Sequence, residues 1–190
     1  MQGKHAVSSK TVENLILDAG VLIFNYGEED EHMLGATRGG STWNLNRTVR
    51  TMEADGARGP IRGMRRIESV APTLQVNVLE MTKANLLRFI SGHKVDESSN
   101  PTHDVITGKE IDPSDYVKNV ALVATVSGEE EPVIIIIKNA LAEGDWSLQL
   151  QDKDEANPSI TFTAHFDPED LNEETGTWDE PWEIRWPKAL

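Results

Sequence analysis

Asp55-Gly56-Ala57-Arg58-Gly59-Pro60-Ile61-Arg62-Gly63-Met64-Arg65-Arg66 separates two segments whose residues alternate as in β-strands. Its glycines reach backbone conformations that other residues avoid, and its proline has no amide hydrogen to donate. The stretch is therefore not the middle of a helix or strand. The sequence predicts a hairpin loop with a basic rim, carried on a protein that is acidic elsewhere.

The segments on either side of this loop predict the strands of a long antiparallel hairpin. Residues 42–52 alternate between a face that includes Trp43 and Leu45 and a face of threonine and asparagine. Residues 67–80 alternate in the same way, with Leu74 on the apolar face. Such alternation is typical of strands with one buried and one solvated face.

One helix is expected at residues 81–90, where the apolar residues change to the spacing of an amphipathic helix. Thr82 is the expected N-cap and Gly92 the expected stop. The polar residues 93–113 predict a loop. Further strands are expected over residues 15–26, 116–126, 133–137, 146–151 and 160–166, and a short helical turn over residues 141–144.

These elements predict a mainly β (α+β) fold. We expect an antiparallel β-sandwich or barrel of two packed sheets, with one flanking α-helix, a long hairpin loop and extended terminal arms. The 190 residues fit a single domain over residues 1–190. Its arms would comprise residues 1–14 and 168–190.

Composition excludes several classes of function. There are 32 acidic and 18 basic residues, for a net charge of -14, which disfavours a conventional DNA-binding domain and anionic membranes. The absence of cysteine excludes disulfides, thiolate metal sites and a cysteine nucleophile. No apolar run is long enough to cross a bilayer, and the opening residues lack the apolar core of a signal peptide, so we expect maturation in a cytoplasm.

Motifs for catalysis and metal binding are weak. The loop glycines resemble a phosphate cradle, but no lysine–serine pair follows and the next element is a strand. His93 and His103 lie near acids without a recognised ligand spacing, and Asp152, Asp154 and Glu155 fit an acidic turn better than a calcium loop. No carboxylate pair stands out for glycoside hydrolysis. We therefore expect no catalytic residue, no metal site, no cofactor and no enzymatic activity.

Three segments resemble those of major tail proteins of long-tailed (siphophage-like) bacteriophages, which form the tail tube. They are residues 17–21 (LDAGV), 34–40 (LGATRGG) and 55–63 (DGARGPIRG). The order of glycine-rich turn, strand, basic loop, strand and helix is also similar, over roughly the first half of the chain. The resemblance implies a structural virion protein, assembled in the bacterial host cytoplasm into stacked hexameric rings that form the conduit for DNA ejection.

The same resemblance implies the partners. They are further copies of the chain, the tape measure, tail terminator and distal tail proteins, and viral DNA that passes through the lumen without specific binding; no membrane is involved. An acidic lumen would let DNA slide, because it neutralises no phosphates.

The loop between the two long strands would contact a neighbouring ring or subunit. A basic loop that meets an acidic surface sets orientation and register. The alternative is a solvated loop, whose surface ion pairs contribute only ~0–1 kcal/mol each. The candidate contact residues are Asp55, Gly56, Arg58, Gly59, Pro60, Arg62, Gly63, Arg65 and Arg66.

Three tryptophans, Trp178, Trp182 and Trp186, lie close together near the C-terminus. We expect them to anchor the C-terminal arm on its own sandwich or on a neighbour, because large aromatic side chains are efficient anchors. Stacking on sugars, in a carbohydrate-binding β-sandwich module, is an alternative. A further alternative is another virion β-protein, such as a head-decoration or tail-completion subunit.

Overall fold

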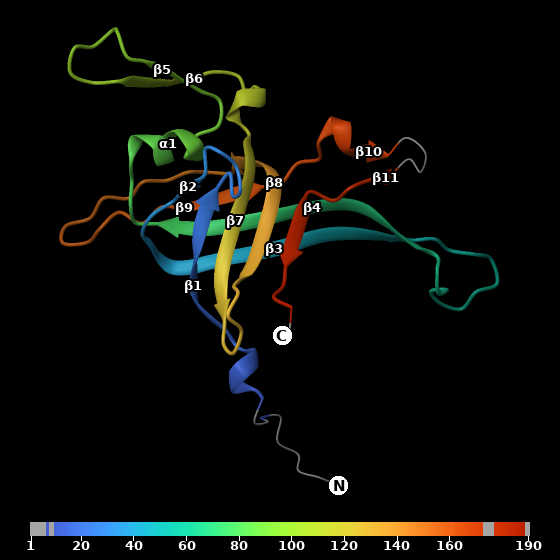
Figure 1. Ribbon diagram of the computed structural model, residues 1–190. Helices are drawn as coiled ribbons and strands as arrows, with labels where there is room; N and C mark the ends of the chain where they lie inside the picture. Colours follow the sequence, from blue (N-terminus) through green and yellow to red (C-terminus); the bar gives the residue numbers. More distant parts are fainter. Residues whose placement is uncertain (1–6, 8–9, 173–176, 189–190) are drawn as a thin grey trace.

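The computed structural model describes residues 7, 10–172 and 177–188. Eight antiparallel strands form one continuous sheet in the order β2-β1-β7-β8-β9-β4-β3, and β12 also pairs with β8 (Figure 1). Their bounds are β1 Ile16–Phe24, β2 His32–Met33, β3 Thr37–Thr51, β4 Arg65–Val78, β7 Val117–Val126, β8 Val133–Glu143, β9 Ser159–Thr163 and β12 Trp182–Arg185.

Smaller elements surround this sheet. Two short hairpins pair β5 (His93–Asp96) with β6 (Val105–Gly108) and β10 (Leu171–Asn172) with β11 (Thr177–Trp178). The α-helix of the described residues is α1 (Lys83–Phe89), and short 3-10 turns are η1 (Val12–Asn14), η2 (Pro113–Asp115) and η3 (Pro168–Asp170). None of the helices in this part of the chain is both long and apolar enough to span a membrane.

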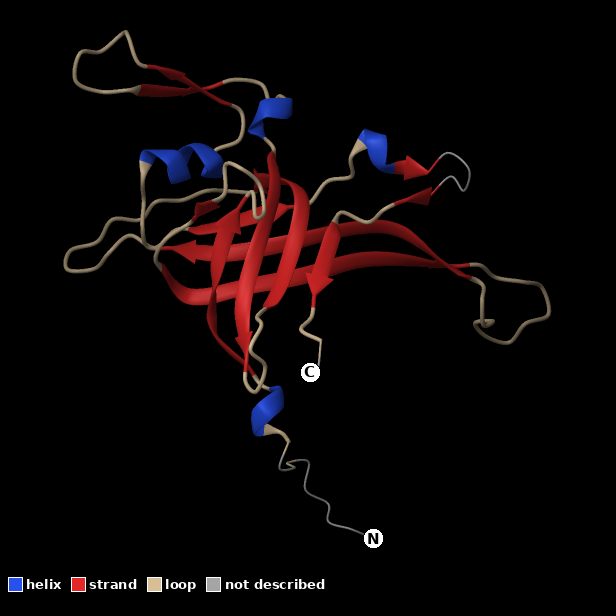
Figure 2. Ribbon diagram, in the orientation of Figure 1, coloured by secondary structure: helices blue, strands red, loops and turns tan. Residues whose placement is uncertain are grey.

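The sheet folds over at β8. The first half of β8 pairs with β12 and its second half pairs with β9, while β7 lies along its other edge. Strands β1, β7 and β8 therefore run across β3 and β4 as a second layer (Figure 2). Together with the one α-helix among the described residues, this confirms the predicted mainly β fold of two packed layers. Part of the expected C-terminal arm, as β12, belongs to the sheet.

The core lies between these two layers. Phe24 of β1 meets Phe162 of β9 edge to face, with ring centroids 5.5 Å apart. On β4, Leu74 and Val76 are fully buried while Gln75 between them is exposed, as one-sided strand burial requires. The predicted long hairpin is confirmed, with β3 and β4 paired from Thr37–Val78 to Thr51–Arg65.

Helix α1 confirms the helix expected within residues 81–90, with Thr82 as its N-cap and a turn at Gly92. The hydroxyl of Thr82 accepts a hydrogen bond from the Asn85 amide at 3.1 Å, which caps the first turn. Phe89 packs on Phe162 with ring centroids 6.3 Å apart. Gly92 has φ +67, and a Cβ there would lie 2.6 Å from the Lys109 carbonyl oxygen, so the chain turns where only glycine fits.

Three predicted segments differ. Residues 93–113 contain the β5–β6 hairpin rather than a plain loop. Residues 141–144 were expected to form a helical turn, but residues 141–143 continue β8, because Leu141 is buried and pairs with Thr163 of β9. Residues 146–151 alternate like a strand but form none, since none of the described strands pairs with them. Trp146 packs on the core while Leu150 is exposed.

Candidate subunit interface

The outer half of the β3–β4 hairpin extends away from the body of the protein (Figure 1). From residue 46 to the end of β3, and from Arg65 to Ser69 on β4, residues on both faces of the ribbon are exposed. Val49 pairs directly with Ile67, yet these side chains are 49% and 51% exposed. In the described part of the chain, Arg47 of this half contacts Glu180 and Trp182, whereas the residues beyond it toward the tip have no covering layer.

The backbone hydrogen bonds of the tip loop join residues within the loop and at its base. The Met52 amide donates to the Met64 carbonyl at 2.9 Å and closes the hairpin. Two further turns form inside the loop, from the Ala57 amide to Ala54 and from the Met64 amide to Ile61, each 3.2 Å. These backbone bonds leave the loop side chains free to contact other molecules.

The predicted loop residues all lie at this tip. Arg65 and Arg66 are the first two residues of β4 rather than part of the loop, and the remaining ones lie in residues 55–63. Gly56 and Gly63 have φ +85 and +88, a left-handed backbone that favours glycine. Gly59 has no such strain, and a Cβ there would meet nothing within 4 Å.

The positive charge of the tip is not neutralised within the subunit. Among the described residues, Arg50, Arg58, Arg62 and Arg65 have no carboxylate within ion-pair distance. Arg66 donates only to backbone carbonyls, at 3.1 and 2.9 Å. Arg50 and Arg66 lie directly opposite each other, and like charges in that position destabilise a strand pair.

Arginines nearer the body are paired. Arg38 reaches Asp154 at 3.0 Å and Glu155 at 2.9 Å in the loop between β8 and β9, at the end of the protein away from the hairpin tip (Figure 1). Its hydrogen bond and charge lower the pKa of Asp154. The same loop carries Asp152, and the β7–β8 turn carries residues 129–131, all glutamate. The subunit is thus basic at the tip and acidic at other loops.

Trp182 packs within its own subunit. It lies on β12, opposite Ile137 of β8, with its ring 5.9 Å from that of Trp43 and 5.4 Å from the Arg47 guanidinium. Arg47 also pairs with Glu180, which accepts a bond from the Trp182 indole. Burial disfavours the charged form of the Glu180 carboxylate, but the bonds from Arg47 and Trp182 outweigh this effect, so the pKa of Glu180 is lowered.

The other two tryptophans have separate surroundings. Trp178 meets Phe166 edge to face, with ring centroids 6.1 Å apart. Trp186 is 58% exposed and has no ring contact or hydrogen bond in the described part of the chain. No ring contact joins any two of the three among the described residues, so they do not form one aromatic platform.

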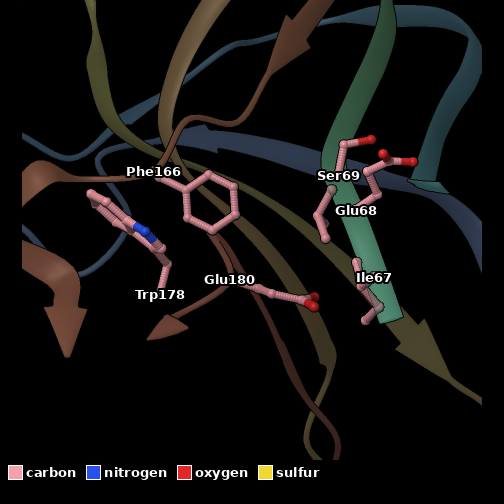
Figure 3. A pocket seen from close by; sticks show the side chains of 7 residues that line it. Ile67, Glu68, Ser69, Phe166, Trp178 and Glu180 are labelled. Carbon is pink, nitrogen blue, oxygen red and sulfur yellow. The ribbon is translucent and has the colours of Figure 1, made fainter. Parts of the chain in front are cut away.

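A pocket of about 540 Å³ opens between Trp178 and the outer half of the hairpin. Phe166 and Trp178 form one wall, and Ile67 and Ser69 of β4 form the other (Figure 3). Sequence reasoning missed this pocket, because Phe166 and Trp178 lie far from β4 in the chain. The closeness of Val49 to Ile67 could have been predicted from the sequence, since the alternation of both strands continues as far as the loop.

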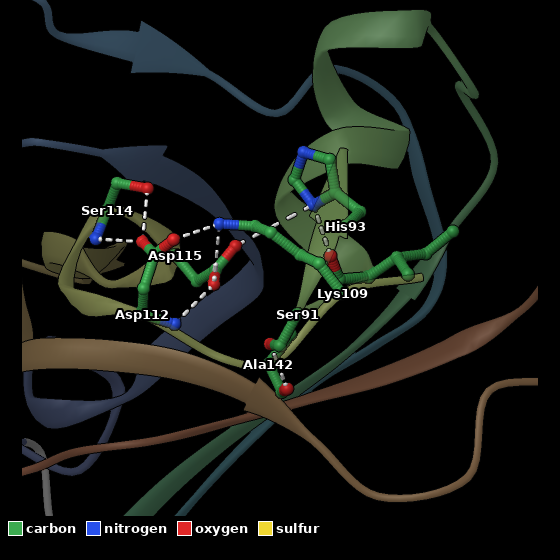
Figure 4. A network of polar contacts seen from close by, with 8 residues as sticks. Ser91, His93, Lys109, Asp112, Ser114, Asp115 and Ala142 are labelled. Atoms are coloured by element: carbon green, nitrogen blue, oxygen red, sulfur yellow. Dashed lines mark hydrogen bonds and ion pairs between the residues drawn. The ribbon is translucent and has the colours of Figure 1, made fainter. Parts of the chain in front are cut away.

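A polar network near α1 holds the β5–β6 hairpin on the body (Figure 4). Asp115, whose side chain is 3% exposed, accepts from the Asp112 amide at 2.8 Å and lies 3.6 Å from the Lys109 ammonium. Lys109 and Ser114 lower the pKa of Asp112 to about 2. The Ser114 hydroxyl donates a hydrogen bond to Asp112, and His93 Nδ1 contacts the Ile90 carbonyl instead of Ser114. This network therefore contains no nucleophile–base pair.

The expected metal-binding candidates are dispersed. His103 contacts Thr102, whereas Asp154 and Glu155 pair with Arg38. No group of three or more histidine, aspartate or glutamate side chains in the described ranges is arranged to hold a metal ion.

Comparison with the models of known protein families gives no match, and comparison with curated protein sequences gives none either.

Proposed function

We propose that this protein is a structural, self-assembling subunit of a phage tail tube, arranged in stacked hexameric rings. The observation that carries the proposal is the outer half of the β3–β4 hairpin. It is exposed on both faces and ends in arginines without carboxylate partners in the described part of the subunit. Contact with another copy would cover its apolar side chains and neutralise its charge.

Energetics favours an assembled hairpin. A two-stranded ribbon without a covering layer is only marginally stable in water. The exposed Val49–Ile67 pair and the facing Arg50 and Arg66 both disfavour the free ribbon. An acidic, partly apolar surface on a second copy would relieve both conditions at once, and the net charge of -14 indicates that acidic surface is plentiful.

The sheet edge supports lateral association. Strand β3 pairs only with β4 among the described strands, and apart from the Arg38 carbonyl, which accepts a bond from the Asn157 side chain, its other edge has no backbone partner among the described residues. A free strand edge presents unpaired amides and carbonyls that another copy can complete. Ring formation by edge pairing and stacking by the hairpin would use different surfaces of the same subunit.

The resemblance of residues 17–21, 34–40 and 55–63 to tail tube proteins supports the more specific part of the proposal. It supplies the hexameric ring, the virion tail as location, the tape measure, tail terminator and distal tail proteins as partners, and DNA ejection as the role. The acidic composition suits a channel through which DNA slides, because a basic lumen would hold phosphates.

Concentration-dependent assembly tests this proposal. Purified protein is concentrated stepwise at low and at physiological salt, and each sample is examined by sedimentation velocity and negative-stain electron microscopy. Rings or tubes with a central channel are expected. Monomers that persist over a hundredfold range of concentration in every buffer would overturn the proposal.

A further inference from the structure

The pocket beside the hairpin has an apolar floor and an acidic rim. Phe166, Trp178 and Ile67 line it and are 38%, 43% and 51% exposed, which is high for large apolar side chains gathered around one cavity. Glu68 and Glu180 stand at its edge (Figure 3). Exposed aromatics around a hollow with a polar rim are the usual composition of a protein-binding site.

The position of Glu68 results from a β-bulge. Thr48 pairs with Ser69 and Val49 pairs with Ile67, so Glu68 is the extra residue on β4. A bulge redirects the side chain of the extra residue and is common where a strand serves a binding site. Glu68 has no ion-pair partner among the described residues, whereas Glu180 is paired with Arg47. The rim therefore holds one uncompensated carboxylate.

The chemistry of the pocket matches the hairpin tip of another copy. Ile61 is exposed at the tip beside Pro60, and Arg62 follows it without a carboxylate partner in the described chain. An apolar side chain next to an arginine is the complement of an apolar floor next to a carboxylate. The Trp178 ring offers an additional surface for a guanidinium.

We propose that this pocket receives the hairpin tip of a second copy, with Ile61 against Phe166 and Trp178 and with Arg62 paired to Glu68. The inference rests on the proposed function and names the docking site that it uses. The tip and the pocket are different surfaces of one subunit, so the contact is head to tail. A contact of this type repeats from copy to copy and closes into a ring or continues as a stack.

Cysteine cross-linking tests the docking directly, because the chain contains no cysteine of its own. The variant Ile61→Cys/Ser69→Cys is assembled and oxidised, and a ladder of covalent oligomers is expected on a non-reducing gel. The Met64 amide donates to the Ile61 carbonyl, so residue 61 stays in the tip turn. Ser69 lies four residues into the extended strand β4, roughly 13 Å beyond Arg65, which is too far for a disulfide within one subunit. The matched control, Ile61→Cys/Thr107→Cys, places the second cysteine on exposed β6 and should give no ladder.

Charge exchange is the second measurement. Glu68→Arg and Arg62→Glu should each raise the protein concentration needed for assembly by at least about tenfold, and the double variant should restore it. Trp178→Ala should raise it similarly while the monomer stays folded, with only a small decrease in its unfolding temperature from the lost contact with Phe166.

The outcomes separate the two proposals. If tubes form normally with Trp178→Ala and Glu68→Arg and no ladder appears, the docking site is wrong and the proposed function stands. If the unmodified protein never assembles, both fall. Saccharide binding that Trp178→Ala abolishes, without a ladder, would also overturn the docking site.

Discussion

Arg50 of β3 lies directly opposite Arg66 of β4 in the exposed half of the hairpin. Like charges at such positions repel, and the described residues bring no carboxylate within ion-pair distance of either side chain. Neighbouring pairs of the ribbon lack a covering layer as well. The hairpin is thus less stable in the isolated subunit than its length suggests, and an acidic partner would stabilise it.

Arg50→Glu should therefore have opposite effects on folding and assembly. A carboxylate in place of this guanidinium, directly opposite Arg66, should stabilise the monomer by about 0.2–1 kcal/mol, as a urea titration measures. The same change removes a positive charge from the interface and should raise the concentration needed for tubes. A variant that becomes both less stable and better assembled would contradict this interpretation.

Gly59→Val and Arg62→Glu should block assembly and leave the monomer folded. Both positions are exposed, and a side chain at residue 59 meets nothing within 4 Å in the subunit. Circular dichroism and thermal unfolding should match those of the unmodified protein, while electron microscopy shows no tubes. Lys94→Glu, a charge reversal on exposed β5, is the matched control and should assemble. Normal tubes from both tip variants would exclude the tip as a contact.

Assembly should slow as salt concentration rises. Unpaired arginines at the tip and the acidic rest of the subunit attract over about 10 Å at 0.1 M salt, and this range shortens at higher ionic strength. Light scattering should give a lower initial rate at 0.5 M than at 0.05 M sodium chloride. A rate that is constant or rises with salt would indicate that apolar contacts alone drive assembly.

Trp182→Ala should destabilise the subunit, and Trp186→Ala should not. Trp182 is partly buried against Trp43 and Arg47, so its loss should cost about 2–3 kcal/mol, somewhat less than a fully buried tryptophan. Trp186 is mostly exposed, and its loss should change the free energy of unfolding by less than about 0.5 kcal/mol. Equal losses in urea titrations would contradict the different roles of these two side chains.

The network around Asp112 should make the stability of the folded protein depend on pH in the acidic range. Lys109 and Ser114 lower the pKa of Asp112 from its usual 3.8 to about 2. Because the pKa is lower in the folded protein, the stabilisation is fully present above about pH 4 and is lost as the pH falls toward 2. Urea titrations at several pH values should show a shallower decline for Asp112→Asn. The same decline in both proteins would mean that Asp112 does not contribute.

The elements that the sequence predicted well are those with local signals. Thr82 and Gly92 bound helix α1, and the glycine-rich loop ends the two hairpin strands. The segments that were wrong depend on partners distant in the chain. Leu141 extends β8 because β9 pairs with it. Leu150 lies outside the strands because none of those in the described ranges pairs with its segment.

The candidate interface also has one part that the sequence predicts and one part that only the fold reveals. Its basic tip is visible in the sequence, since Arg58 and Arg62 lie in a loop that glycine and proline define. Its pocket is not, because only the folded sheet brings Phe166 and Trp178 near β4. The bulge that sets Glu68 apart also requires the register of two strands, which alternation alone does not specify.

A cryo-electron microscopy reconstruction of the assembled protein would show whether the hairpin tip contacts another subunit. The map should show residues 52–64 of each subunit in contact with another copy, and the apolar pair Val49 and Ile67 covered at that contact. An assembly in which every hairpin tip points into solvent, with the outer half of β3 and β4 still uncovered, would contradict the account.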